Sequence, residues 1–240
     1  MKSTGSRGAA KRLRYERVPS TLTGIVALAA AGSGLAAIAM AALWGWHLRL
    51  RRSGLSKAAW PLVAGALAVF YASVADGASV RRSAIAWMIG SWGARLGVYW
   101  VWDRVLSRPA DAPLRESLAS FERRAVAAAF FSLPAIFASV DPEPTLGVRE
   151  IVAAAVWLVG FAGETTADRQ LVRWQRGNNE GECVAGLWRY VPHAHDVFEL
   201  VTWSAHALFA SASPFGWVAM ACPAAVAYRF YANGMRRAQL

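Results

Sequence analysis

The longest stretch of the chain without a charged side chain limits what the chain can fold into. No Asp, Glu, Lys or Arg occurs from Val18 to Leu48, a run of 31 residues. An α-helix needs about 20 apolar residues to cross the roughly 30 Å hydrocarbon layer of a membrane. Ala and Gly are frequent in this run, and small residues allow membrane helices to pack closely. We therefore predict a membrane span. A cleavable signal peptide is the competing interpretation, although its apolar core would be only about 7–15 residues long.

Five further segments are uncharged or nearly so, and Arg95 is the one charge within them. They cover residues 58–75, 83–102, 125–140, 151–163 and 200–228. The last segment is long for one span, and Pro214 in its middle predicts the turn of a helical hairpin. The chain is 56% hydrophobic and 17% charged, whereas about a quarter of the residues in a soluble domain are charged. We therefore predict an all-α, polytopic membrane helix bundle of six or seven transmembrane helices.

The basic residues lie mostly outside these segments. Residues 1–20 form a basic N-terminal tail, and residues 21–240 are predicted to form a single integral-membrane domain. Most Lys and Arg fall on the side of the predicted membrane that holds the C-terminus, which favours a cytoplasmic C-terminus, although the basic tail favours the opposite. The formal net charge of +11 then reflects basic groups beside lipid headgroups, so we predict the lipid bilayer as a partner and no nucleic acid.

One connecting segment, residues 164–196, is long and polar enough to hold a site. Glu164 and Asp168 lie four residues apart on a predicted helix. Three arginines follow on the same helix: Arg169, Arg173 and Arg176. Guanidinium groups beside carboxylates at a membrane surface suit the recognition of a phosphate-bearing ligand. A solvated helix with salt bridges is the plainer interpretation, and the sequence leaves both open.

Two further features could carry chemistry. Arg95 is an ionisable residue within a predicted span, which makes it a functional candidate unless it snorkels or pairs with Asp103. His193, His195 and Glu199 are close in sequence and could bind a transition metal. The chain has only four histidines and lacks the histidine motifs of membrane hydroxylases, so we predict no metal site.

The polar segment and the residues that follow it also show an ordered pattern. Its members are Glu164, Ala167, Asp168, Gln170, Gly186, Leu187, Trp188, Arg189, Tyr190, His193 and Glu199. This pattern resembles the C-terminal signature of the steroid 5-alpha-reductase-like membrane proteins. Bacterial members typically have E-x-x-x-A-D-x-Q followed by G-L-W-R-Y-x-R-H-P-N-Y-F-G-E. With weaker similarity around Arg95 and in residues 125–138, the resemblance covers roughly residues 85–230, and it places a reductase-like region at about 150–240.

The resemblance implies a membrane-embedded, NADPH-dependent reductase that reduces a carbon–carbon double bond (an enone) of a lipid-like or steroid-like substrate in a bacterial inner membrane. In such enzymes the cofactor carries the hydride chemistry, and the protein positions the cofactor and supplies a proton. The residues implied to contact the cofactor are Asp168, Gln170, Arg173, Arg189, His193 and His195. Glu199 and Tyr190 are implied to be catalytic, and Tyr99 is a second candidate for the proton donor.

Several positions depart from the family pattern. Pro192, His195 and Asp196 stand where the family has Arg, Asn and Tyr. The loss of a cation and the gain of a carboxylate should weaken binding to a polyanionic dinucleotide. Two alternatives therefore stay open. One is a catalytically degenerate membrane scaffold or lipid-binding member. The other is a lipid methyltransferase that uses S-adenosylmethionine, because such enzymes share an R-H-P-x-Y motif in a similar bundle.

Overall fold

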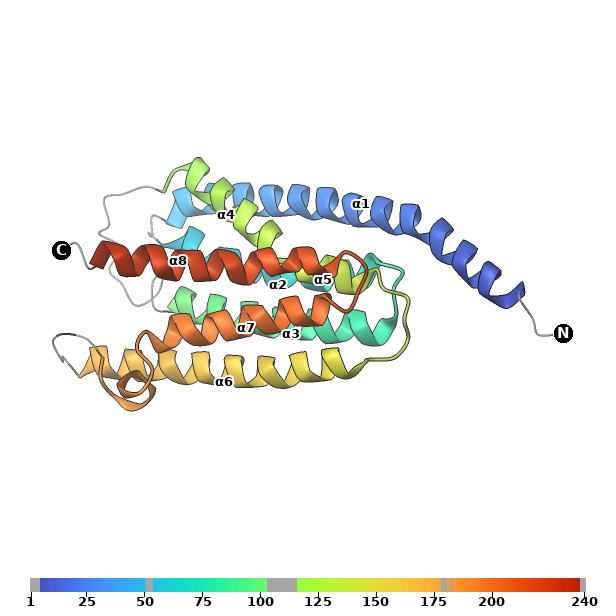
Figure 1. Cartoon of the computed structure of the whole chain (residues 1–240). Coiled ribbons are helices and arrows are strands. Elements are labelled where there is room, and N and C mark those ends of the chain that lie inside the picture. The colour runs from blue at the N-terminus through green and yellow to red at the C-terminus, as the bar shows by residue number, and fades with distance from the viewer. Residues whose placement is uncertain (1–4, 51–53, 103–115, 178–180, 182, 238–240) are drawn as a thin grey trace.

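The computed structural model describes residues 5–50, 54–102, 116–177, 181 and 183–237, and within these ranges it contains helices and no strand. The α-helices are α1 (Gly5–Leu50), α2 (Leu55–Val74), α3 (Ser79–Trp100), α4 (Leu118–Phe131), α5 (Leu133–Ser139), α6 (Val148–Arg176), α7 (Ala194–Ala210) and α8 (Ala221–Arg237). They lie alongside one another in an elongated bundle, beyond which the start of α1 extends (Figure 1). The predicted all-α class is confirmed.

Three of the described helices are long and apolar enough to cross a membrane. They are Leu22–Arg49, Leu55–Val74 and Val148–Arg176. Their length and composition indicate a membrane protein, as the uncharged segments predict. The N-terminus and the C-terminus lie at opposite ends of the bundle, and the connection from α6 to α7 lies at the C-terminal end (Figure 1).

Two prolines mark changes of direction in the chain. The predicted hairpin is present, since α7 and α8 lie side by side and the turn between them contains Pro214. Within the uncharged segment 125–140, the helix is interrupted at Ser132, and Pro134 occupies the start of α5. Proline is tolerated there because the first turn of a helix leaves its N–H groups without intrahelical acceptors. Helices α4 and α5 therefore follow one another along the bundle as a broken helical path.

Close backbone contacts and large aromatic rings hold the bundle together. A Cβ atom at Gly93 of α3 would lie 2.3 Å from the carbonyl oxygen of Pro61 of α2, so only glycine allows this approach. The rings of Trp60, Trp92 and Trp203 form successive contacts between α2, α3 and α7, with centroids 5.7 and 4.8 Å apart. Such edge-to-face pairs add to the stabilisation from burial. These ring contacts place the half of α3 that carries Arg95 against α7.

Helices α6 and α7 approach one another equally closely. A Cβ atom at Gly160 of α6 would lie 2.8 Å from the backbone nitrogen of Thr202 of α7. The two helices pack along their lengths, so that the C-terminal part of α6 faces the N-terminal part of α7. Charged side chains that are far apart in the sequence on these two helices are thereby brought into contact.

Candidate functional site: a polar network beside an arginine-lined cavity

Arg95 of α3 reaches the two carboxylates that begin the polar part of α6. Its Nη2 lies 2.5 Å from Oε1 of Glu164, and its Nη1 donates a hydrogen bond to Oδ2 of Asp168 at 2.7 Å. The other oxygen of Glu164 accepts a hydrogen bond from Nε1 of Trp92 at 3.2 Å. Glu164 is completely buried, and these partners compensate for its removal from solvent. The alternative partner, Asp103, lies outside the described residues.

Helices α7 and α8 extend these contacts. Nδ1 of His195 lies 2.7 Å from Oδ1 of Asp168, and its Nε2 lies 3.7 Å from Oε2 of Glu199. Arg229 of α8 forms an ion pair with Glu199 and lies 3.9 Å from Asp196. We call the connected residues the polar network: Arg95, Glu164, Asp168, His195, Glu199 and Arg229. Each buried carboxylate of this network therefore has a cationic partner within the protein.

His195 lies at the start of α7, ahead of the uncharged segment 200–228, and outside the three helices that are apolar enough to span a membrane. Burial lowers its pKa, but the hydrogen bond to Asp168 and the charges of Asp168, Glu164 and Glu199 outweigh burial and raise the pKa to about 9. His195 is therefore protonated at neutral pH.

Two groups of side chains in this network have the spacing of metal ligands. One is Glu164, Asp168 and His195, and the other is His195, Asp196 and Glu199; in each, the ligand atoms lie within 4.8 Å of one another. The same carboxylates already form ion pairs with arginines from α3 and α8. A metal ion would have to displace these guanidinium groups. We therefore interpret both groups as parts of an ion-pair network, and the absence of a metal stays a prediction.

Gln170 and Trp188, both part of the sequence pattern, anchor the segment that follows α6. Oε1 of Gln170 accepts a hydrogen bond from the backbone N–H of Leu187 at 2.8 Å, and Nε1 of Trp188 donates to the carbonyl of Ala167 at 3.0 Å. Gly186 begins a short 3₁₀ helix, Gly186–Arg189, with a φ of 58°, and a Cβ there would collide with the Gln170 side chain. These residues thus have a structural explanation, which does not depend on a cofactor.

The predicted residues at the end of this 3₁₀ helix and after it make other contacts. Arg189 is exposed, with its guanidinium 5.9 Å from the ring centroid of Tyr190, and the Tyr190 side chain is 78% exposed. His193 has a φ of 54° and its ring packs against Phe230 at 5.7 Å. The structure therefore brings Asp168, His195 and Glu199 together, whereas Arg189 packs against Tyr190 and His193 against Phe230.

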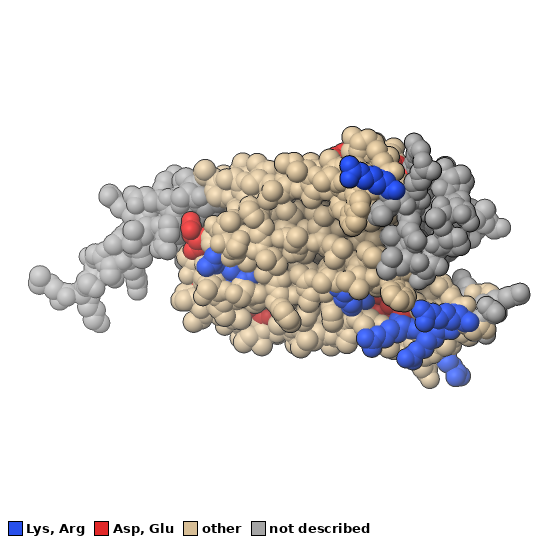
Figure 2. All heavy atoms as spheres, turned by 180° about the vertical axis from the view of Figure 1, so that it is seen from behind, with Lys and Arg blue, Asp and Glu red and all other residues tan. Residues whose placement is uncertain are grey.

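A cavity of about 870 Å³ borders the polar network, between the C-terminal parts of α3 and α6. Helix α3 contributes Ala94, Arg95, Val98, Tyr99 and Trp102. Helix α6 contributes Thr165, Asp168, Arg169, Val172, Arg173, Gln175 and Arg176. Four guanidinium groups and one carboxylate thus line one hollow, and Figure 2 shows basic side chains gathered near one end of this face. The predicted arginine cluster of α6 is a wall of this cavity.

The sequence did not predict two partners of the network, Arg229 and Trp92. Arg229 directly follows an uncharged segment, a position typical of a residue that anchors a helix end in the headgroup region. Trp92 lies in the resemblance around Arg95 but carries no signal for a hydrogen bond to a distant carboxylate. Contacts between helices of this kind depend on packing and are not encoded in local spacing.

A family model described as "Protein of unknown function (DUF1295)" matches residues 43–232. The chain belongs to this family. No curated protein and no solved structure matches the chain. The DUF1295 match includes the polar network and the whole lining of the arginine-lined cavity, and it begins after the basic N-terminal tail. The site therefore lies within the part of the chain that defines membership of DUF1295.

Proposed function

We propose that the chain is a membrane-embedded, NADPH-dependent reductase-like protein that reduces a carbon–carbon double bond of a lipid-like enone. The observation that carries the proposal is the cavity in which Arg95, Arg169, Arg173 and Arg176 surround Asp168. DUF1295 is associated with steroid 5-alpha-reductase-like proteins, which supports the resemblance of the sequence pattern. A volume of about 870 Å³ lies in the range of ordinary cofactor and ligand pockets, which is roughly 300–1,000 Å³.

The chemistry of the cavity fits a phosphate-bearing cofactor. A guanidinium group presents its N–H donors in a planar fork that matches phosphate oxygens. Arg169, Arg173 and Arg176 lie on one face of α6 and would hold the phosphates of NADPH. S-adenosylmethionine carries no phosphate and bears a sulfonium cation, which four arginines would repel. The cavity therefore favours NADPH over the cofactor of the alternative methyltransferase.

The polar network supplies positioning in this proposal. Asp168 is held from two sides by Arg95 and His195, so its carboxylate is fixed at the cavity wall. Glu199 contacts His195 and Arg229 rather than the cavity, which makes it a positioning residue. When bound, the cofactor supplies the hydride. Tyr99 lines the cavity, so it is better placed than the exposed Tyr190 to donate the proton.

We also propose that the uncharged segments of the remaining helices cross the membrane, which gives seven passes with the cavity on the cytoplasmic side. Helices α3, α7 and α8 and the α4–α5 path lie alongside the three apolar helices (Figure 1). The arginine-lined cavity lies toward the end that holds the C-terminus, and the positive-inside rule favours this end as cytoplasmic. A bacterial inner membrane would give the cavity access to cytoplasmic NADPH.

The proposal is tested by titrating the purified protein with NADPH and following energy transfer from tryptophan to the bound nicotinamide. Trp102 lines the cavity and should act as a donor. S-adenosylmethionine is the contrasting ligand, and oxidation of NADPH with a panel of apolar enones measures turnover. A protein that neither binds NADPH nor oxidises it with any enone contradicts the proposal.

A second candidate is a catalytically degenerate, lipid-binding member. The observation that favours it is that the carboxylates of the polar network are fully engaged by cations of the protein. Val98 and Trp102, which are 64% and 60% exposed, also line the cavity and would face lipid. Saturable binding of an anionic phospholipid without any binding of NADPH would support this candidate over the reductase.

A further inference from the structure

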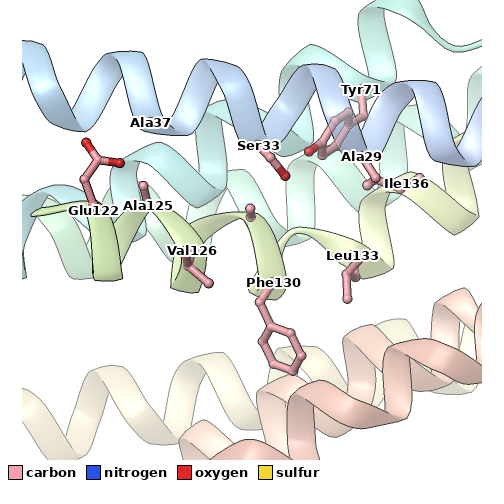
Figure 3. A pocket seen from close by; sticks show the side chains of 11 residues that line it. Ala29, Ser33, Ala37, Tyr71, Glu122, Ala125, Val126, Phe130, Leu133 and Ile136 are labelled. Atoms are coloured by element: carbon pink, nitrogen blue, oxygen red, sulfur yellow. The ribbon is translucent and has the colours of Figure 1, made fainter. Parts of the chain in front are cut away.

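A second cavity, of about 300 Å³, lies between α1 and the α4–α5 path (Figure 3). We call it the alanine slot because four alanines that line it leave it unfilled: Ala29, Ala37, Ala125 and Ala129. Larger apolar side chains complete its walls: Val126, Phe130, Leu133 and Ile136. The slot shares no lining residue with the arginine-lined cavity, so an inference about it rests on the proposed membrane crossing of the α4–α5 path but not on the proposed reductase activity.

A close contact between α1 and α2 forms the floor of the slot. A Cβ atom at Gly32 would lie 1.8 Å from the hydroxyl oxygen of Tyr71, so the phenol rests directly on the backbone of α1. The Tyr71 side chain is completely buried, and its hydroxyl lies 3.4 Å from Oγ of Ser132. The neighbouring Ser33 lines the slot with its hydroxyl. The middle of an otherwise apolar slot therefore carries two hydroxyl groups.

Glu122 lines one end of the slot (Figure 3). Its side chain is partly buried, and no described residue forms a hydrogen bond or an ion pair with it. Glu116, six residues earlier, instead accepts hydrogen bonds from the backbone N–H groups of Gly54 and Ser56. A carboxylate beside an apolar, membrane-facing cavity is costly unless a cation or a hydrogen-bond donor compensates for it.

We propose that the alanine slot binds a membrane-resident amphiphile with a protonated amine head and a single apolar chain. The ammonium group pairs with Glu122, and the chain lies along the alanines toward Leu133 and Ile136. Val126 lines the slot and is 69% exposed, so the slot is open toward the surrounding lipid. The charge of Glu122 favours a cationic head group, because the carboxylate repels an anionic head group and cannot form an ion pair with a neutral one.

Three probes that share a twelve-carbon alkyl chain and differ in the head group test this proposal: dodecylamine, dodecanol and dodecyl sulfate. Native mass spectrometry of the whole protein in a neutral detergent counts the molecules bound at each concentration. We expect one dodecylamine per chain, bound at least tenfold more tightly than dodecanol, and no saturable binding of dodecyl sulfate. Glu122→Gln should weaken dodecylamine binding tenfold or more and leave dodecanol binding unchanged, because only the ion pair is lost.

Two further variants separate the slot from the rest of the surface. Ala129→Phe fills the slot and should weaken the binding of dodecylamine and dodecanol together. Glu143→Gln, which changes an exposed carboxylate outside the slot, should leave both unchanged. The proposal is overturned if Glu122→Gln binds dodecylamine like the natural protein, or if dodecanol or dodecyl sulfate binds as tightly as the amine. The comparison of the three probes on the natural protein decides the question even if a variant fails to fold.

Discussion

Helix α3 carries two largely buried arginines that both pair with carboxylates, yet only one of them lines a cavity. Arg81 pairs with Glu150 and lies 3.4 Å from Asp141, and it donates hydrogen bonds to the carbonyls of Glu143 and Thr145. Its side chain is 4% exposed and lines neither of the two cavities. Arg81 therefore joins α3 to α6 and to the segment before it, and has no surface to offer a ligand.

Arg95 also pairs with two carboxylates, both of them on α6, but its side chain is 15% exposed and forms part of a cavity wall. Three further arginines line that cavity, so positive charge exceeds the negative charge there. A buried ion pair alone is therefore weak evidence for function, since both arginines have one. Space beside the pair and an excess of one charge distinguish a binding site from a structural contact.

The largest expected effect comes from replacing Arg81, the arginine with a structural role. Arg81→Met leaves Asp141 and Glu150 buried without their cation, and loss of one partner of a buried ion pair costs about 3–5 kcal/mol. We expect a corresponding loss in the free energy of unfolding, measured by denaturant or thermal unfolding in detergent.

The matched control for this variant is Arg149→Gln, because Arg149 is an exposed arginine beside Glu150 that donates one exposed hydrogen bond, to the carbonyl of Ser211, and contacts no buried carboxylate in the described residues. A surface substitution of this kind usually changes stability by less than about 0.5 kcal/mol. If Arg81→Met unfolds no more readily than Arg149→Gln, then Arg81 does not hold α3 to α6, and the distinction between the two arginines fails.

The next effect concerns binding at the other end of α3. Arg173 is exposed and lines the arginine-lined cavity, so Arg173→Gln should leave stability unchanged. A hydrogen bond to a charged group contributes about 1.5–3 kcal/mol, so affinity for NADPH should fall by at least tenfold in a fluorescence titration. Arg149→Gln, on the same helix but outside the cavity, should bind NADPH normally. If the two variants bind NADPH with equal affinity, the arginine-lined cavity is not the NADPH site.

The sequence contains a signal for both ion pairs of α3 with α6, the pair of Arg81 and the pair of Arg95. The sequence analysis singles out only Arg95 as a candidate. Arg81 and Arg95 are fourteen residues apart, and so are their partners Glu150 and Glu164. Fourteen residues are about four helical turns, or roughly 21 Å, so each pair of residues falls on one helix face. Equal intervals of opposite charge on two helices are what parallel packing in register requires. Local spacing instead suggested Asp103 as the partner of Arg95.

Other features follow directly from local chemistry. The uncharged segments and Pro214 predict the helices and the final hairpin, because hydrophobic length and proline act locally. The arginine cluster of α6 is likewise visible as a spacing on one helix face. The contact of His195 with Asp168 and the ion pair of Arg229 with Glu199 are not visible in local spacing. They depend on the packing of α7 against α6 and of α8 against α7.

A third effect should appear as a pH dependence of stability. Folding raises the pKa of His195 to about 9, so its protonated form is favoured in the folded protein. The contribution is complete below the ordinary pKa of about 6.5 and is lost as the pH rises through about 9. We expect the Tm to fall between pH 6.5 and pH 9.5, and His195→Gln to reduce that fall. An identical pH profile in both proteins would show that His195 is not held by the network.

The smallest effect is expected at Tyr190. Its side chain is 78% exposed and does not line the cavity, so Tyr190→Phe should change neither the Tm nor the affinity for NADPH measurably. Tyr99 lines the cavity beside Arg95, and Tyr99→Phe should lower the rate of enone reduction at least tenfold at unchanged affinity. Each variant removes one phenolic hydroxyl group, so the two variants differ only in where that group lies. If Tyr190→Phe lowers the rate and Tyr99→Phe does not, the proton comes from the segment after α6, and the reaction is not confined to the cavity between α3 and α6.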